Sequence, residues 1–211
     1  MGAKVLSRER FLDVAVGYAD RGGLEGLTLR QLGEELGVDA TAVYRYFRSK
    51  SDLLVAVLTV KLGEALTDEL AQGFEELPAL ARIEHLLMAA RRTFMAYPSL
   101  AAGLAGMTDA PRSTSELSHL AFEAIGELGY EPREVALRYQ MLESYVIGAS
   151  LFDGTGHPHN WDIRAARYRS SGMPGVREVS SSPEATRDFS EEAFAKGLRL
   201  LLAAVTAEAK R

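Results

Sequence analysis

The segment from residue 28 to residue 50, TLRQLGEELGVDATAVYRYFRSK, constrains the fold of this chain most, because it marks where two successive helices begin and end. Thr28 and Gln31 have the spacing of a capping box, in which reciprocal hydrogen bonds satisfy free amides of the first helical turn. Gly37 suits the end of that helix, since glycine adopts the left-handed conformation without strain. Asp39 can cap a second helix. The segment therefore predicts two short helices joined by a tight turn.

The apolar residues of this segment give each helix an inner and an outer face. The positions expected to be buried are Leu29, Leu32 and Leu36 in the first helix and Val43 and Phe47 in the second, at residues 40–47. The positions expected to face outward on the second helix are Thr41, Ala42, Tyr44, Arg45 and Tyr46. Such an outer face suits a DNA major groove, where Arg reads guanine and Thr reads a base edge or a methyl group. The alternative is a helical hairpin with a solvated face.

The charge distribution supports the DNA-binding interpretation although the whole chain is acidic. The formal net charge is −5, but residues 1–52 hold eight Lys and Arg against eight Asp and Glu, so the excess of acid lies beyond them. Residues 40–51 contain three basic residues and no acidic residue. Local charge, rather than the total, sets the attraction to phosphate. We therefore expect DNA binding with modest affinity for non-specific sequences.

The pattern closely resembles the DNA-binding signature of the tetracycline-repressor (TetR) family of bacterial regulators, over residues 8–56. In that family a Thr opens the second helix and a Gly closes it. The third helix carries a Tyr, one residue, an aromatic or His, and a Phe, and a Lys opens the fourth. The matching positions are Thr28, Gly37, Tyr44, Tyr46, Phe47 and Lys50. Tyr46 stands where His is common, and both side chains can donate to a phosphate.

The resemblance and the residue types together predict which side chains contact DNA. We assign Arg30, Thr41, Ala42 and Arg45 to base edges, and Thr28, Tyr44, Tyr46 and Lys50 to phosphates. Phosphate contacts fix the position of a protein on DNA, and base contacts give specificity. Ser49 and Asp52 cap a further helix, so Lys50 lies in its first turn, where a helix N-terminus favours an anion.

Composition and hydrophobic periodicity predict an all-α chain of about nine to ten helices. We expect a three-helix helix-turn-helix domain at residues 1–52 and a helical ligand-binding and dimerisation domain at residues 53–211. The helix after Ser49 continues to about Gln72 with no Gly-, Pro- or Ser-rich linker, so it can transmit movement between the two domains. The 211 residues include no cysteine, which excludes disulfides and thiol catalysis. No signal peptide and no apolar run of about 18 residues is visible, so we expect a cytoplasmic protein without membrane contact.

Two helices of the second domain, at residues 132–152 and 191–208, are apolar on two sides. A helix of this kind must be covered on two sides. We interpret them as a four-helix bundle that joins two copies of the chain, and the resemblance agrees, since the family dimerises through a long late helix and its last helix. A buried core within one chain is the alternative. Residues 153–190 are rich in Gly, Pro and Ser and predict little regular structure.

The second domain combines apolar walls with a few polar groups, which is typical of a small-molecule site. The candidate ligand contacts are His85, Met88, Tyr97, Met107, Tyr139, Leu142, Glu143 and Trp161. Glu143 is the sharpest, because a carboxylate in an apolar helix needs a partner. That partner is a ligand cation, Arg138, or an Arg of a second subunit.

No catalytic motif, cofactor or metal site is predicted, and the pair His157 and His159 is better explained by a polar loop. The function that the resemblance implies is a homodimeric repressor that a small-molecule inducer releases from a palindromic DNA operator. Two alternatives stay open: a DNA-binding dimer without a small-molecule ligand, and a ligand-binding helical bundle without operator binding.

Overall fold

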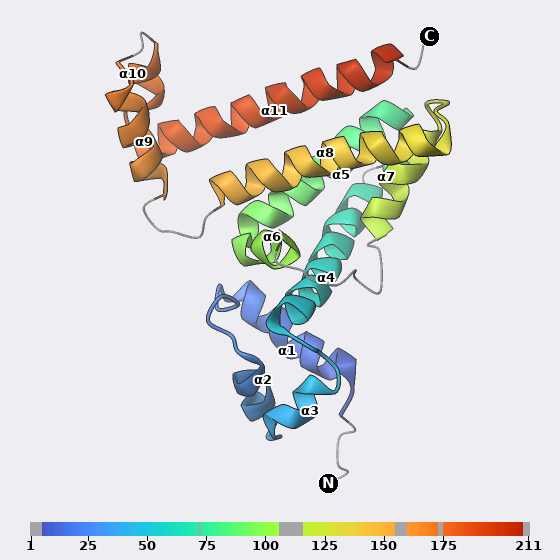
Figure 1. Ribbon diagram of the computed structural model, residues 1–211, viewed down its shortest axis with the longest axis vertical. Coiled ribbons are helices and arrows are strands. Elements are labelled where there is room, and N and C mark those ends of the chain that lie inside the picture. Colours follow the sequence, from blue (N-terminus) through green and yellow to red (C-terminus); the bar gives the residue numbers. More distant parts are fainter. Residues whose placement is uncertain (1–5, 72, 106–115, 155–159, 173–174, 209–211) are drawn as a thin grey trace.

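The computed structural model describes residues 6–71, 73–105, 116–154, 160–172 and 175–208. Within these ranges the chain forms eleven α-helices and one 3-10 turn, and no strand (Figure 1). The all-α prediction is confirmed, with one helix more than the upper expected number. No helix in the described ranges is both long enough and apolar enough to cross a membrane.

The helices follow one another with short connections. Their bounds are α1 Arg8–Asp20, α2 Leu29–Glu35, α3 Ala40–Tyr44, α4 Lys50–Leu70, the 3-10 turn η1 Phe74–Glu76, α5 Ala79–Ala96, α6 Pro98–Ala105, α7 Glu116–Gly126, α8 Pro132–Asp153, α9 Asn160–Ser170, α10 Val176–Val179 and α11 Pro183–Glu208. In Figure 1, α1, α2 and α3 form a small head at one end of the molecule, and α4 rises from it into the larger group of helices.

Local capping determines the head, as the sequence predicts. Thr28 and Gln31 form the complete capping box at the start of α2, and Asp39 accepts a hydrogen bond from the Thr41 amide at the start of α3. Gly37 follows α2 with a φ of +68°. Phe11, Leu32, Val43 and Phe47 are fully buried and close the core of the head, while Leu36 is half-buried.

Gly33 has a structural role that periodicity alone did not reveal. A Cβ at this position would lie 2.9 Å from the carbonyl oxygen of Val38 and 3.3 Å from Cγ2 of Val43. A glycine is therefore needed where the backbone of α2 approaches the turn that leads into α3.

The second helix of the segment is shorter than predicted. We expected a helix over residues 40–47, but α3 ends at Tyr44. The amides of Tyr46 and Phe47 both donate to the carbonyl oxygen of Val43, at 2.9 and 3.0 Å. Sharing one acceptor closes the helix and turns the chain toward Ser49, whose side chain caps α4.

α4 belongs to both parts of the molecule. Its buried side chains run from Leu53 near the head to Leu66 in the C-terminal part, and one connected cluster of buried apolar residues spans both parts. On its flank, a Cβ at Gly103 of α6 would lie only 2.8 Å from Cβ of Leu54. The division between residues 52 and 53 therefore falls inside a continuous helix, and the two domains stay an interpretation.

α8 and α11 lie side by side (Figure 1) and contact each other closely. The Tyr145 hydroxyl donates to the Phe194 carbonyl oxygen at 3.0 Å, and the two rings stack at 5.2 Å. A Cβ at Gly197 would lie 2.1 Å from that hydroxyl oxygen. The missing side chain of Gly197 therefore makes room for Tyr145 of the same chain, and this position of α11 faces α8.

Residues 153–190 contain more regular structure than their composition predicts. They hold α9, α10 and the first turns of α11, which begins at Pro183 rather than at residue 191. Asp153 is buried here between two arginines, pairing with Arg91 of α5 at 2.5 Å and with Arg164 of α9. Removing one partner of a buried ion pair leaves an uncompensated charge, so this cluster fixes α9 against α5 and α8.

Candidate DNA-binding surface and ligand cavity

The outer surface of α3 presents the residue types that the sequence predicts. Thr41, Tyr44 and Arg45 are exposed, and Tyr44 leaves 56% of its surface in solvent. Ala42 is half-buried. The Asp39 carboxylate is occupied by the cap, where the hydrogen bond from the Thr41 amide lowers its pKa. The Asp39 carboxylate is therefore tied to the backbone, and residues 40–51, which follow it, include no acidic residue.

Two further candidates lie on α2 or at its start. The Arg30 side chain is 82% exposed and pairs with Glu34 at 2.9 Å. Exposed ion pairs contribute little to stability, so Arg30 can exchange Glu34 for another acceptor at small cost. The Thr28 hydroxyl lies at the surface but already takes part in the capping box, 2.8 Å from Oε1 of Gln31.

Tyr46 and Lys50 both interact with the chain itself. The Tyr46 hydroxyl donates to the Leu6 carbonyl oxygen at 3.0 Å, and its ring lies 5.4 Å from that of Phe11. The expectation that Tyr46 faces outward is wrong, because α3 ends before it and the following turn brings the ring against α1. The Lys50 ammonium is half-buried and donates to the carbonyl oxygen of Glu25. Whether these two residues contact phosphate stays a prediction.

A polar junction joins α1 of the head to α4 and to the end of α5. The buried Lys61 pairs with Asp20 at 2.6 Å and with Glu64 at 2.9 Å, and the Tyr97 hydroxyl donates to Asp20 at 3.1 Å. Burial disfavours the charged Lys61, but its hydrogen bonds to Asp20 and Glu64 outweigh this and raise its pKa. The hydrogen bond from Lys61 lowers the pKa of Asp20. The junction is therefore charged at neutral pH and ties the head to α4.

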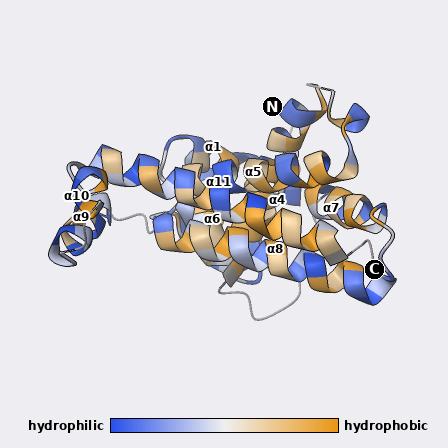
Figure 2. Ribbon diagram, turned by 90° about the horizontal axis from the view of Figure 1, so that it is seen from above, coloured by the Kyte–Doolittle hydropathy of each residue, from blue (hydrophilic) through white to orange (hydrophobic). Residues whose placement is uncertain are grey.

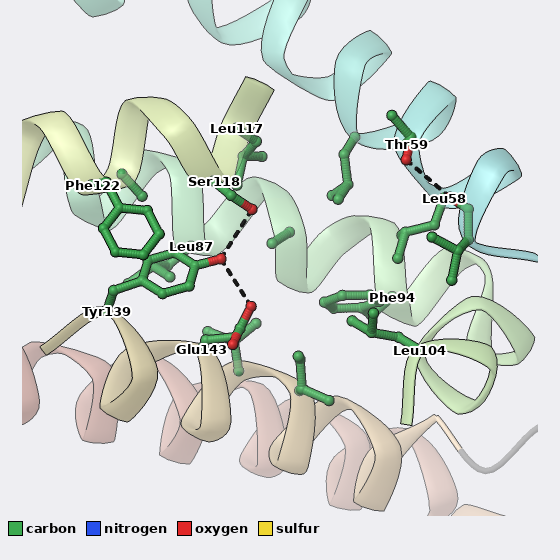
Figure 3. Close-up of a pocket in the computed structure, with 16 residues that line it drawn as sticks. Leu58, Thr59, Leu87, Phe94, Leu104, Leu117, Ser118, Phe122, Tyr139 and Glu143 are labelled. Carbon is green, nitrogen blue, oxygen red and sulfur yellow. Dashed lines mark hydrogen bonds between the residues drawn. The ribbon is translucent and has the colours of Figure 1, made fainter. Parts of the chain in front are cut away.

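A cavity of about 230 Å³ lies among α4, α5, α6, α7 and α8 (Figure 3). Its walls are mostly aliphatic and aromatic, which is the usual composition of a small-molecule site. The lining residues are Val55, Leu58, Thr59, Leu62, Leu87, Ala90, Phe94, Leu104, Leu117, Ser118, Ala121, Phe122, Tyr139, Glu143, Val146 and Ile147.

One corner of this cavity is polar. The Tyr139 hydroxyl lies 2.8 Å from Oε1 of Glu143 and 2.9 Å from Oγ of Ser118 (Figure 3). A phenol has one proton, so Tyr139 donates to the carboxylate and can accept from the Ser118 hydroxyl. Burial, together with the Glu143 charge, raises the pKa of Tyr139, and the phenol is neutral at pH 7. The Phe122 ring stacks on Tyr139 at 4.1 Å and holds it in place.

Tyr139 and Glu143 are the two sequence-predicted ligand contacts that line the cavity. Arg138, which the sequence suggested as a partner of Glu143, pairs with Glu134 instead and lies 3.7 Å from the Tyr130 ring centre. Glu143 accepts a hydrogen bond from Tyr139.

The other predicted ligand contacts lie elsewhere. His85 is at the surface beside Glu69, with 2.7 Å between Nδ1 and Oε2. Tyr97 belongs to the Lys61 junction, and Met88 and Leu142 pack in the core away from the lining. Trp161 is half-buried on α9 next to Arg164. Met107 falls outside the described residues, as do His157 and His159. No cluster of three or more potential metal ligands occurs within the ranges that the structure describes.

Most of the residues that line the cavity were not predicted, because they have the same helical spacing as buried core residues. Leu58 and Leu62 of α4 and Leu87 of α5 belong to regular apolar stripes, and such stripes usually indicate buried packing. Ser118 and Thr59 are common helix residues. Only the lone carboxylate in an apolar helix, Glu143, carried a usable signal.

The fold and the head match known proteins. A profile described as "Bacterial regulatory proteins, tetR family" matches residues 11–57, which covers α1 to α3 and the start of α4. The crystal structure of apo ActR from Streptomyces coelicolor superposes with a TM-score of 0.72 at 20% identity, covering 99% of both chains. The head therefore matches the profile of the tetR family, and the chain as a whole has the fold of the ActR structure. A second structure, ActR in complex with (S)-DNPA, gives a TM-score of 0.71 at 20% identity and covers 98% of this chain and all of that one.

The curated proteins that this chain is similar to are named as transcription regulators. The HTH-type transcriptional repressor DrrR1 of Streptomyces coeruleorubidus is 28% identical over 69% of this chain and 53% of its own length. An HTH-type transcriptional regulator of Saccharopolyspora erythraea is 25% identical over 69% and 60%. The match thus spans little more than half of these two relatives. The tetracycline repressor protein class D of Escherichia coli is 25% identical over 93% of this chain and 88% of its own.

Proposed function

We propose that this protein is a cytoplasmic transcriptional repressor that binds a palindromic DNA operator as a homodimer and is released by a small-molecule ligand. The observation that carries the proposal is the course of α4. Its first turn packs in the head, and Val55, Leu58 and Leu62 farther along line the cavity. A single rigid helix thus connects a surface suited to DNA with a space suited to a ligand.

DNA binding follows from the surface of α2 and α3. Thr41, Tyr44 and Arg45 are free to enter a major groove, with Ala42 close to the base edges and Arg30 beside them. Thr28 and Lys50 lie at helix N-termini, where amides and the helix dipole favour phosphate. Tyr46 can join them only if its hydroxyl leaves the Leu6 carbonyl oxygen.

Dimerisation is supported by the outward side of α8 and α11. Leu137 and Met141 of α8 and Leu200 of α11 are exposed, with Met141 at 52% and Leu200 at 65%. Figure 2 shows hydrophobic residues interspersed with hydrophilic ones along both helices. A second copy placed there would cover these residues and complete a four-helix bundle. A twofold axis then requires operator half-sites about one helical turn apart, or a multiple of it.

Release by a ligand requires that the ligand bind the DNA-incompetent conformation more tightly than the other. A ligand in the cavity would contact α4 directly. Leu54 of α4 also packs against Gly103 of α6, and Lys61 of α4 pairs with Asp20 of α1 in the head. A shift of α4 would therefore change the position of the head. The cavity is also the observation that disfavours the alternative of a DNA-binding dimer without a small-molecule ligand.

The proposal is tested by binding of the purified protein to DNA from the region upstream of its own gene, at moderate salt with random-sequence competitor. Tight, competitor-resistant binding supports it and supplies an operator for inducer screening. Binding that disappears as the salt concentration rises means that this DNA fragment is not the operator. If every genomic fragment behaves in this way, the proposal of operator binding is wrong. An inducer that binds the protein without changing operator affinity contradicts the coupling through α4.

A further inference from the structure

Among the described residues, one charged side chain lines the cavity. Among its 16 lining residues only Ser118, Thr59, Tyr139 and Glu143 carry polar side-chain atoms, and only Glu143 is ionisable in the acidic to neutral range. The Thr59 hydroxyl is occupied, because it donates to the Val55 carbonyl oxygen at 3.0 Å. The polar capacity of the cavity is therefore concentrated at the corner where α7 and α8 meet.

The carboxylate of Glu143 is under-coordinated. It receives a hydrogen bond from Tyr139 on Oε1, whereas a carboxylate offers about four acceptor positions. No ion pair among the described residues involves Glu143, although other acids of the C-terminal part, such as Glu69 and Asp153, are paired with arginine. A half-buried carboxylate with one neutral donor in apolar surroundings gains most from a cation with several donors.

We propose that the cavity takes a small apolar ligand that carries a protonated amine, with the ammonium against Glu143 and the apolar body along α4 and α5. An ammonium has three donors, which match the remaining acceptor positions of the carboxylate. Tyr139 holds the carboxylate on one side and leaves the other to the ligand. A ligand carboxylate would meet like charge at this corner and is excluded. The inference names the ligand class of the cavity and so rests on the proposed function.

The volume sets the size of the ligand. An apolar cavity of about 150 Å³ holds benzene, so about 230 Å³ accommodates one aromatic ring with a short alkyl chain. Phe94 and Leu104 line the end of the cavity away from Glu143 and Tyr139 (Figure 3), and offer contact for the ring. A phenylalkylamine of three methylene groups is therefore a suitable probe.

The test compares three probes of one skeleton by calorimetric titration of the full chain at pH 7. The probes are 3-phenylpropylamine, 3-phenylpropan-1-ol and 3-phenylpropanoic acid. We expect the amine to bind at least tenfold more tightly than the alcohol, since hydrogen bonds to charged groups are stronger than neutral ones. The acid should show no measurable binding.

Glu143→Gln keeps the shape of the side chain and removes its charge. In this variant the amine should bind within about twofold of the alcohol, and the alcohol should bind as it does to the natural protein. Glu131→Gln is the matched control, because Glu131 is exposed at the start of α8 and its side chain forms no cap. This control removes the same charge outside the cavity and should leave the preference for the amine intact. It thereby separates recognition by Glu143 from general attraction to a chain of net charge −5.

Tyr139→Phe provides an independent readout if Glu143→Gln does not fold. It removes the donor and leaves the carboxylate with fewer partners, so the preference for the amine should persist or increase. Equal binding of amine and alcohol to the natural protein, no amine binding at millimolar concentration, or an unchanged preference in Glu143→Gln would each overturn the inference.

Operator binding distinguishes this inference from the proposed function. If the amine binds through Glu143 but operator affinity is absent or does not change, the ligand class stands and the proposed function fails. If the protein binds its operator and is released by a neutral or acidic compound while the amine does not bind, the proposed function stands and the ligand class fails.

Discussion

The surface of the head and the cavity lie along the same helix, α4, yet they are assembled from the chain in different ways. The candidate DNA contacts all fall within residues 28–50. The cavity is lined from five helices by residues between Val55 and Ile147. In the head, three helix caps and Gly37 fix the backbone locally. Around the cavity no local rule fixes the lining, because the distance between two helices depends on side chains far apart in sequence.

This difference predicts whether a substitution changes binding or stability. A change on the outer face of α3 meets no other element, so it alters binding and leaves stability nearly intact. A change at a helix crossing of the C-terminal part meets a distant neighbour, so it alters the packing of the whole group of helices.

The largest expected effect separates the two sides of the turn after α3. Phe47→Ala should lower the free energy of unfolding by about 3–5 kcal/mol, because a fully buried aromatic ring is lost. Tyr44→Ala, three residues earlier and exposed, should change it by less than about 0.5 kcal/mol. Urea unfolding measures both. A Phe47→Ala variant as stable as Tyr44→Ala would mean that Phe47 is not packed in the core of the head.

A second test concerns the crossing of α8 and α11. Gly197→Ala should destabilise the protein by about 1–3 kcal/mol, since the added methyl group meets the Tyr145 hydroxyl and overpacks the contact. Gly63→Ala is the matched control, because a Cβ at Gly63 on α4 meets nothing within 4 Å. It should stabilise the protein by about 0.5–1 kcal/mol through helix propensity. The same sign for both variants in thermal unfolding would contradict the close contact.

A third test distinguishes base contact from phosphate contact within the head. Arg45→Ala should weaken operator binding by about 1–3 kcal/mol and reduce discrimination between operator and random DNA. Lys50→Ala should weaken binding to all sequences alike and lower the dependence on salt. Titrations on operator and scrambled DNA at two salt concentrations measure both effects. Equal losses on the two DNAs for Arg45→Ala would contradict its assignment.

The smallest expected effect concerns the junction between head and α4. The pKa of Asp20 is lowered in the folded protein from its ordinary value of 3.8, mainly by Lys61. Its contribution to stability is therefore present above pH 3.8 and is lost as the pH falls through the folded pKa. Asp20→Asn should have a lower melting temperature than the natural protein at pH 7, with the difference closing below pH 3.8. Asp13→Asn, exposed on the same helix, should show no such difference.

The structure of the head could be predicted from sequence because helix caps and a turn glycine act within a few residues. Thr28 with Gln31, Asp39 and Ser49 each cap a helix where expected, and the φ of +68° at Gly37 confirms the turn. Where the head departed from expectation, the cause was a tertiary contact. The ring of Tyr46 packs against Phe11, and periodicity along α3 contains no information about α1.

The sequence by itself determined the all-α class, the helix-turn-helix and the likeness to tetR-family regulators, because capping, glycine conformation and apolar spacing act within a few residues. Only the tertiary structure decided which side chains line the cavity. The cavity is lined by residues of α4, α5, α6, α7 and α8 rather than by the predicted His85, Met88, Tyr97, Leu142 and Trp161. Glu143 accepts a hydrogen bond from a phenol, that of Tyr139. An apolar residue at helical spacing looks the same in sequence whether it faces another helix or an empty space, and only the packing of remote helices decides which of the two it faces.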